Sequence, residues 1–271
     1  MLIKKEAIIP VKKHTLSSRC LQREVRVDFF MPPAYQEKNE IGLLLINDGQ
    51  NMEELGLTGI LSGLYQQNII RPLLCVGIHC GDDRRNEYGT AFVADYKGRG
   101  AKAALYTQFI LEELLPFIHL QSGIISFKEK SFAGFSLGGL SALDIVWNHP
   151  KEFVKAGIFS GSFWWRSKGL DEGYLEATDR IMHARIREGH YYPWLKFFFE
   201  TGTLDETEDR NNNGIIDCID DTIALIEELE HKGYKRQRDI EYLELKDGRH
   251  DVATWAIAMH VFLKWGWGKT I

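Results

Sequence analysis

The sequence predicts an α/β protein with a mostly parallel central sheet and helices on both of its faces. Short, continuously apolar runs recur at 41–46 (IGLLLI), 73–78 (LLCVGI) and 156–159 (AGIF), and such runs are typical of strands that are buried on both faces. Segments with helical spacing lie between them, and this alternation favours parallel strands joined by helices. Because no repeat, low-complexity tract or linker interrupts the 271 residues, we expect a single domain over residues 1–271.

Two segments in the first half complete this pattern. Residues 23–31 alternate between apolar and polar side chains, which indicates an antiparallel strand with one face in solvent. Residues 101–115 have the spacing of an amphipathic helix, and Pro116 is expected to kink or end it.

The second half of the chain continues the alternation. A small aromatic-rich insertion with short helices is expected at about 163–193, after the sixth strand region. Before the insertion, we expect a short strand that includes residues 132–133 and a helix at 141–148. After it, we expect a strand at 196–201, a helix at 221–232, a strand at 240–245 and a helix at 252–265.

The composition is typical of a soluble globular protein. Hydrophobic residues make up 44%, charged residues 26%, and the formal net charge is -5, so nucleic acid is not an expected partner. No apolar run approaches the ~18–20 residues that a membrane-spanning helix needs. The first ten residues lack the apolar core of a secretory signal, which predicts a cytoplasmic protein. The four cysteines contain no C-x-x-C pair and are expected to be reduced thiols.

Residues 134–138 contain the pattern G-x-S-x-G, with a short apolar run before it and a helical run after it. A strand, sharp turn and helix in that order hold a serine, here Ser136, in a strained conformation with its hydroxyl exposed. The first N–H groups of the new helix then point at whatever the serine attacks. The pattern also fits an ordinary strand-to-helix turn, so the residues around it decide its meaning.

A nucleophilic serine needs a base and an acid that orients the base. His250 lies in a loop between a strand and a helix, whereas His231 and His260 fall within helices, so His250 is the candidate base. Asp205 is the first carboxylate after the strand at 196–201 and is the candidate acid, with Glu206 as its competitor. The alternative for Asp205 is that it only caps a turn.

Stabilising an oxyanion takes two backbone donors. The N–H of Leu137, directly after the serine, is one candidate. The other is expected from the loop 47–51 (NDGQN), where we assign the N–H of Gln50, with Asn51 next to it.

The chain resembles the putative esterase family of α/β-hydrolases, which includes esterase D-type, feruloyl esterase, enterochelin esterase and mycolyltransferase proteins. The segments that carry the resemblance span most of the chain: 48–51 (DGQN), 84–88 (RRNEY), 113–116 (ELLP), 133–139 (AGFSLGG), 149–150 (HP) with Phe153, 160–165 (SGSFWW), 202–205 (GTLD), and 248–251 (GRHD) with Trp255.

This resemblance implies an α/β-hydrolase fold and a triad of Ser136, Asp205 and His250, with oxyanion donors at Leu137 and at the residue after Asp48-Gly49. We therefore expect a serine carboxylesterase that works through an acyl-enzyme on a small-molecule or sugar ester. The H-G-x-G-G loop of feruloyl-type members is replaced by Asn47-Asp48-Gly49-Gln50, which at this point is closer to the enterochelin esterase and mycolyltransferase branch. Acyl transfer to an alcohol or sugar, and ligand binding on an inactive hydrolase fold, are the alternatives.

Residues 209–220 (DRNNNGIIDCID) fit the calcium loop of an EF-hand, with acidic or amide residues at positions 1, 3, 5, 9 and 12 and glycine at 6. The final Asp in place of Glu resembles the dockerin variant of this loop. The alternative is a solvated polar turn. A bound Ca²⁺ would favour an exported protein, and no other cofactor is expected. The expected Ca²⁺ ligands are Asp209, Asn211, Asn213, the Ile215 carbonyl, Asp217 and Asp220.

Aromatic residues in or beside the insertion have two interpretations, a platform for an aromatic acyl group or a sugar, or ordinary core. They are Trp164, Trp165, Tyr191, Tyr192 and Trp194. Similarly, Arg84 and Arg85 are expected either to hold a substrate carboxylate or to pair with Glu87.

Overall fold

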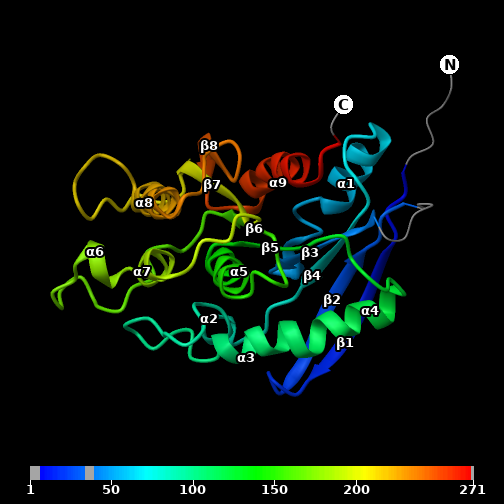
Figure 1. Ribbon diagram of the computed structural model, residues 1–271, viewed down its shortest axis with the longest axis horizontal. Coiled ribbons are helices and arrows are strands. Elements are labelled where there is room, and N and C mark those ends of the chain that lie inside the picture. The colour runs from blue at the N-terminus through cyan, green and yellow to red at the C-terminus, as the bar shows by residue number, and fades with distance from the viewer. Residues whose placement is uncertain (1–6, 34–39, 270–271) are drawn as a thin grey trace.

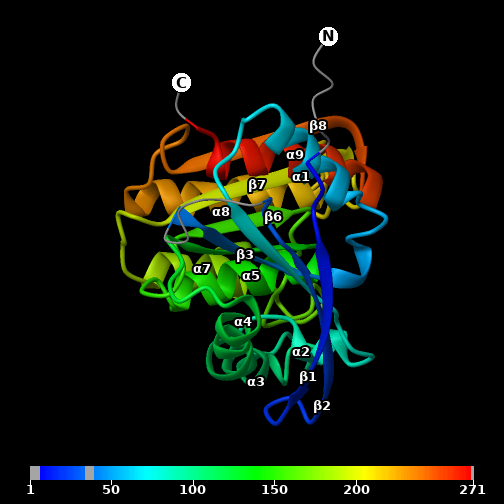
Figure 2. The same ribbon diagram turned by 90° about the vertical axis from the view of Figure 1, so that its right-hand side faces the viewer.

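A computed structural model describes residues 7–33 and 40–269 and has an eight-stranded sheet at its centre (Figures 1 and 2). The strand order is β1-β2-β4-β3-β5-β6-β7-β8. The edge strands β1 (Val11–Ser18) and β2 (Arg23–Phe30) are antiparallel, and all later strands run parallel to one another. This is the α/β-hydrolase fold that the sequence predicted. Residues 1–6, where the sequence lacked a signal, lie outside the described residues.

The parallel strands form the core because their side chains are apolar on both faces. Every residue of β3 (Gly42–Asn47), β4 (Leu73–Ile78) and β6 (Lys155–Phe159) is buried, and so are nearly all of β5 (Lys130–Phe135). The last two strands, β7 (Lys196–Leu204) and β8 (Ile240–Arg249), become more exposed toward the edge and toward their carboxyl ends.

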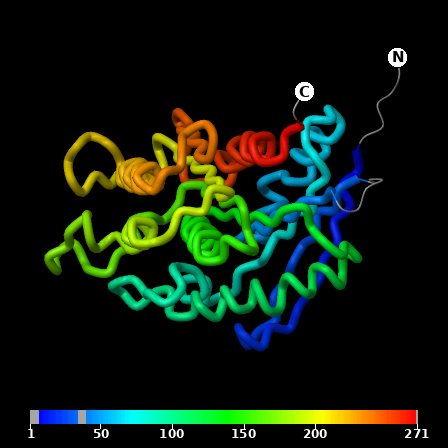
Figure 3. The backbone as a smooth tube through the Cα atoms, viewed as in Figure 1, coloured from blue at the N-terminus to red at the C-terminus, as the bar shows by residue number. Residues whose placement is uncertain are grey.

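Helices cover the two faces of the sheet unequally. One face packs against α1 (Leu57–Gln66) and α9 (Val252–Trp267). The opposite face is covered by α3 (Ala103–Gln108), α4 (Leu115–Ser122), α5 (Leu137–Asn148), α7 (Ile181–Glu188) and α8 (Asp217–Lys232). The insertion, which contains the short α6 (Glu176–Asp179) and α7, lies at the end of the molecule far from β1 and β2 (Figure 3).

The structure departs from the sequence prediction in three places. Strand β1 and helix α1 were not predicted, and β1 is mostly exposed, so its sequence lacks a clear apolar alternation. The helix expected at 101–115 continues through a π-helical turn, η3 (Phe109–Leu114), into α4. Pro116 does not end it: Leu114 and Leu115 keep helical backbone angles, and the π-helical turn lies directly before the proline. No described helix is long and apolar enough to cross a membrane.

Candidate active site

Ser136 lies at the sharp turn between β5 and α5, as predicted. Its backbone is strained, with φ 54° and ψ −124°, and its N–H donates to the Phe159 carbonyl at 2.8 Å. Strand and helix approach so closely here that a Cβ on Gly134 would stand 2.3 Å from the Gly138 carbonyl oxygen. The glycines of G-x-S-x-G are therefore required by packing, and the turn presents the Ser136 side chain at the carboxyl edge of the sheet.

Several backbone N–H groups near this turn lack an acceptor among residues 7–33 and 40–269, and two of them are the predicted oxyanion donors. These two are the N–H of Leu137, the first residue of α5, and that of Gln50, in the short 3₁₀ segment η2 (Gly49–Asn51) after β3. Because β3 and β5 are paired in register and parallel, both groups lie at the same edge of the sheet. The Ser136 hydroxyl oxygen is 3.4 Å from that of Ser162.

Buried polar contacts cross-link the loops after β3 and β5. The guanidinium of Arg84 donates to both Asp48 carboxylate oxygens at 2.7 Å and lies over the Tyr88 ring. The Asn47 amide donates to the Gly138 carbonyl at 2.8 Å. These contacts hold the Asp48–Gln50 turn against the start of α5.

The expected pairing of Arg84 or Arg85 with Glu87 is not observed. Glu87 is buried and accepts two hydrogen bonds from Arg23, at 2.7 and 2.6 Å, while Arg84 turns to Asp48. Arg85 is exposed. Arg84 thus has a structural role beneath the site.

Asp205 follows β7 at the same edge of the sheet. Its Oδ2 accepts from the Cys218 thiol at 3.2 Å, and its Oδ1 is buried without a partner among the described residues. The competitor Glu206 faces the start of α8 and accepts from the Cys218 backbone N–H. Burial raises the pKa of Glu206 to about 7. Of these two carboxylates, only Asp205 has a buried oxygen without a partner among the described residues.

His250 lies between β8 and α9, as predicted, and its ring meets Trp255 edge-on at 5.3 Å. Trp255 is fixed in turn by its N–H bond to the Ser160 hydroxyl at 2.9 Å. His250 remains partly open to solvent, and no hydrogen bond joins it to Ser136 or Asp205 in this structure. Partial burial lowers the pKa of His250, and the Asp205 carboxylate opposes this shift. Its imidazole is therefore neutral near pH 7 and able to accept a proton.

Glu200 was missed by the sequence analysis. It lies in β7, is only 1% exposed, and neither carboxylate oxygen has a partner among the described residues. Burial raises its pKa to about 8, and the neighbouring Asp205 charge adds to the shift. Its one sequence signal is a carboxylate placed directly after the apolar run 197–199 (FFF).

The predicted calcium loop brings four of its candidate ligands together. The Asp209 carboxylate accepts from the N–H groups of Asn213 and Gly214, and both Asn211 and Asn213 side chains contact Asp220. Asp217 faces elsewhere: it accepts from the Arg210 N–H and pairs with the Arg210 guanidinium at 3.1 Å. The described chain has no group of three His, Cys, Asp or Glu residues that could hold a metal. The prediction of a Ca²⁺ site therefore rests on the carboxylate and amide oxygens that converge in this loop.

The insertion aromatics do not form one platform. Trp164 and Trp165 follow β6 at the same edge as Ser136, and Trp165 is fully buried core. The other three aromatics precede β7 and therefore lie near the amino ends of the parallel strands: Tyr191, Tyr192 and Trp194. There the Trp194 indole donates to the Pro150 carbonyl. Tyr191 and Trp194 are 39% and 47% exposed, so the core interpretation is wrong for these two.

Comparison with known sequences places the chain in a family. Residues 18–265 match the family described as Putative esterase, so the chain belongs to this family and is a hydrolase of the carboxylesterase type. It is 24% identical over 215 residues to the uncharacterized protein YbbA of Bacillus subtilis (strain 168). The aligned region covers 77% of this chain and 79% of YbbA.

Solved structures show the same fold. The enterobactin esterase FES of Shigella flexneri, crystallised in the presence of enterobactin, has a TM-score of 0.71 and 21% identity over 94% of this chain. This chain spans only 58% of that protein's length. The siderophore hydrolase EstB of Aspergillus nidulans has a TM-score of 0.68 and 16% identity, covering 97% of this chain and 98% of EstB.

Proposed function

We propose that this protein is a serine carboxylesterase that works through an acyl-enzyme, with Ser136 as nucleophile, His250 as base and Asp205 as the acid that orients it. The observation that carries the proposal is the strained Ser136 backbone at a turn flanked by two N–H groups without acceptors. The buried, unpartnered Oδ1 of Asp205 supports the acid's role, because an imidazole N–H would satisfy it.

In the first half of the reaction, the Ser136 hydroxyl oxygen attacks the ester carbonyl carbon and its proton passes to His250. The N–H groups of Leu137 and Gln50 donate to the oxygen that becomes negative. His250 then gives the proton to the leaving alcohol, and the acyl group stays on Ser136. Water, deprotonated by His250, releases the acid in the second half. His250 must close on Ser136 and Asp205 when substrate binds, as catalytic contacts often do.

The substrate is proposed to be a small-molecule or sugar ester. Two proteins of similar structure are named for their substrates, an enterobactin esterase and a siderophore hydrolase, and both share the fold of this chain. A panel of p-nitrophenyl, acetylated-sugar and feruloyl esters tests the class. Ser136→Ala should lower kcat on any accepted ester by about 10⁵–10⁶. A variant with unchanged kcat would refute the proposed nucleophile.

We also propose that loop 209–220 holds a structural Ca²⁺. Its oxygen-rich donor set suits Ca²⁺, and the Asp209, Asn211, Asn213 and Asp220 side chains already converge. The ion would order the segment that follows Asp205 and would take no part in the chemistry.

A further inference from the structure

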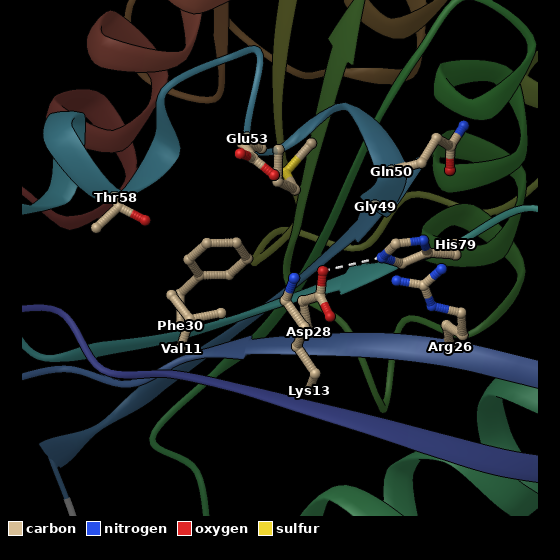
Figure 4. A pocket seen from close by; sticks show the side chains of 11 residues that line it. Val11, Lys13, Arg26, Asp28, Phe30, Gly49, Gln50, Glu53, Thr58 and His79 are labelled. Atoms are coloured by element: carbon tan, nitrogen blue, oxygen red, sulfur yellow. Dashed lines mark hydrogen bonds and ion pairs between the residues drawn. The ribbon is translucent and has the colours of Figure 1, made fainter.

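A cavity of about 500 Å³ opens beside the proposed oxyanion loop and has no role in the proposed chemistry. Figure 4 shows that the sheet forms one wall and the segment after β3 forms the other. The polar lining of the cavity includes Lys13, Arg26, Asp28 and His79 on the sheet side, and Gln50 and Glu53 on the other side. Its volume lies within the range of small-molecule sites.

The sheet wall carries two cations without ion-pair partners. In the register of β1 and β2, Lys13 lies opposite Asp28, and Arg26 is two residues before Asp28, so all three side chains share one face. Neither Lys13 nor Arg26 has a carboxylate within 4.0 Å among the residues that the structure describes. Unpaired cations on the wall of a cavity favour an anionic ligand.

Two carboxylates also face the cavity, and their positions decide where an anion fits. Asp28 is buried and bonds the His79 ring at 2.9 Å. In Figure 4, Lys13 rises beside Asp28, whereas Glu53 lies on the opposite wall. The guanidinium of Arg26 lies near His79, at the side of the cavity where Gln50 is found. The place for an anion is therefore beside Arg26, close to the oxyanion loop.

The direction in which the cavity lies from Ser136 indicates which part of the ester substrate it would bind. The leaving alcohol must face His250, which gives it a proton, and His250 follows β8. The cavity lies on the other side of the nucleophile, because β3, β4 and β2 lead away from β5 in the opposite direction from β8. Of the two parts of an ester bound at Ser136, the acyl group is therefore the one that faces the cavity, which Gln50 lines.

Building on the proposed esterase function, we propose that this cavity binds the acyl group of the substrate and that this acyl group carries a carboxylate, held by Arg26. The preferred substrate is thus a half-ester of a dicarboxylic acid. The Arg26 guanidinium suits a carboxylate because it offers paired N–H donors in one plane.

The test compares two p-nitrophenyl esters of equal chain length, one of glutaric acid with its second carboxylate free and one of its monomethyl ester. The wild-type kcat/KM should be higher for the free acid, and the ratio of the two values should fall roughly tenfold in Arg26→Gln, the loss of one charge-assisted hydrogen bond. Lys12→Gln is the matched control. Lys12 is an exposed cation on the neighbouring strand β1 but faces away from the cavity, opposite Phe29 in the register. It should leave the ratio unchanged.

Binding of glutarate to the Ser136→Ala protein separates this proposal from the proposed function. Glutarate should bind that protein and should bind more weakly once Arg26→Gln is added. Hydrolysis of the methyl ester with no preference for the free acid, together with glutarate affinity that Arg26→Gln leaves unchanged, would overturn the acyl-site proposal and leave the esterase proposal standing. An equal fall of the ratio in Lys12→Gln would also overturn it, since the effect would then be one of net charge.

Discussion

The two halves of the candidate site are built differently. In the nucleophile half, Asp48, Arg84 and Asn47 fix the turns after β3 and β5 through short hydrogen bonds. In the acid–base half, formed by β7, β8 and the loops after them, an oxygen of Asp205 and both oxygens of Glu200 lack partners among the described residues, and His250 is partly open to solvent. Free backbone donors characterise the first half and free carboxylate oxygens the second.

The difference indicates which half must change when substrate binds. The strained Ser136 and its N–H donors need no rearrangement, because the surrounding contacts already determine them. In the proposed mechanism, the acid–base half needs one bond, from the His250 ring to Asp205, before it can work. Substitutions in that half should therefore alter the rate without disturbing the nucleophile.

The largest effect in the acid–base half is expected for Asp205→Asn. The amide would hold the imidazole in the wrong tautomer, and kcat should fall by about 10⁴. Steady-state kinetics on the best ester of the panel measures it. Glu206→Gln is the matched control and should cost far less, because Glu206 faces the Cys218 N–H. The reverse ranking would make Glu206 the acid and would contradict the assignment from free oxygens.

Glu200→Gln should change how stability depends on pH. Burial raises the pKa of Glu200 from 4.5 to about 8, so the folded state holds a proton that the unfolded chain releases. The stability that this proton confers is complete below about pH 4.5 and is lost as the pH rises toward about 8. Glutamine does not titrate. Melting temperatures measured from about pH 5 to about pH 9 should therefore rise in the variant relative to wild type as the pH increases. A constant difference would mean that Glu200 is ionised in the folded protein.

The smallest effect is expected from Ca²⁺, which acts on the segment after Asp205. Binding should stabilise the fold by about 2.7 kcal/mol at a hundredfold excess over Kd. Chelation should lower the melting temperature and reduce activity moderately, with recovery in Ca²⁺ and much less in Mg²⁺. Asp209→Ala should mimic chelation, and Asp171→Ala, an exposed aspartate outside the loop, should not. Identical melting curves with EDTA and with millimolar Ca²⁺ would contradict the Ca²⁺ proposal and would mean that the loop is only a polar turn.

The sequence predicted the parts of the fold and site that depend on local patterns. The apolar runs identified the parallel strands, and G-x-S-x-G located the turn, since its glycines are fixed by contacts within a few residues. It could not predict features that depend on distant partners. The sequence does not distinguish Glu200 from an ordinary strand residue, because its burial depends on the elements that pack around β7. The cavity joins β1, β2 and His79, directly after β4, to the segment after β3, and β1 has no sequence pattern that would reveal it.

The central claim, that Ser136 is a nucleophile prepared by its backbone, is tested most directly by covalent labelling. The protein is treated with a fluorophosphonate, digested, and the modified residue is identified by mass spectrometry. The account predicts one adduct, on Ser136, that persists at a reduced rate in Asp205→Asn and is absent in Ser136→Ala. An adduct on another residue, or labelling that survives Ser136→Ala, would contradict it.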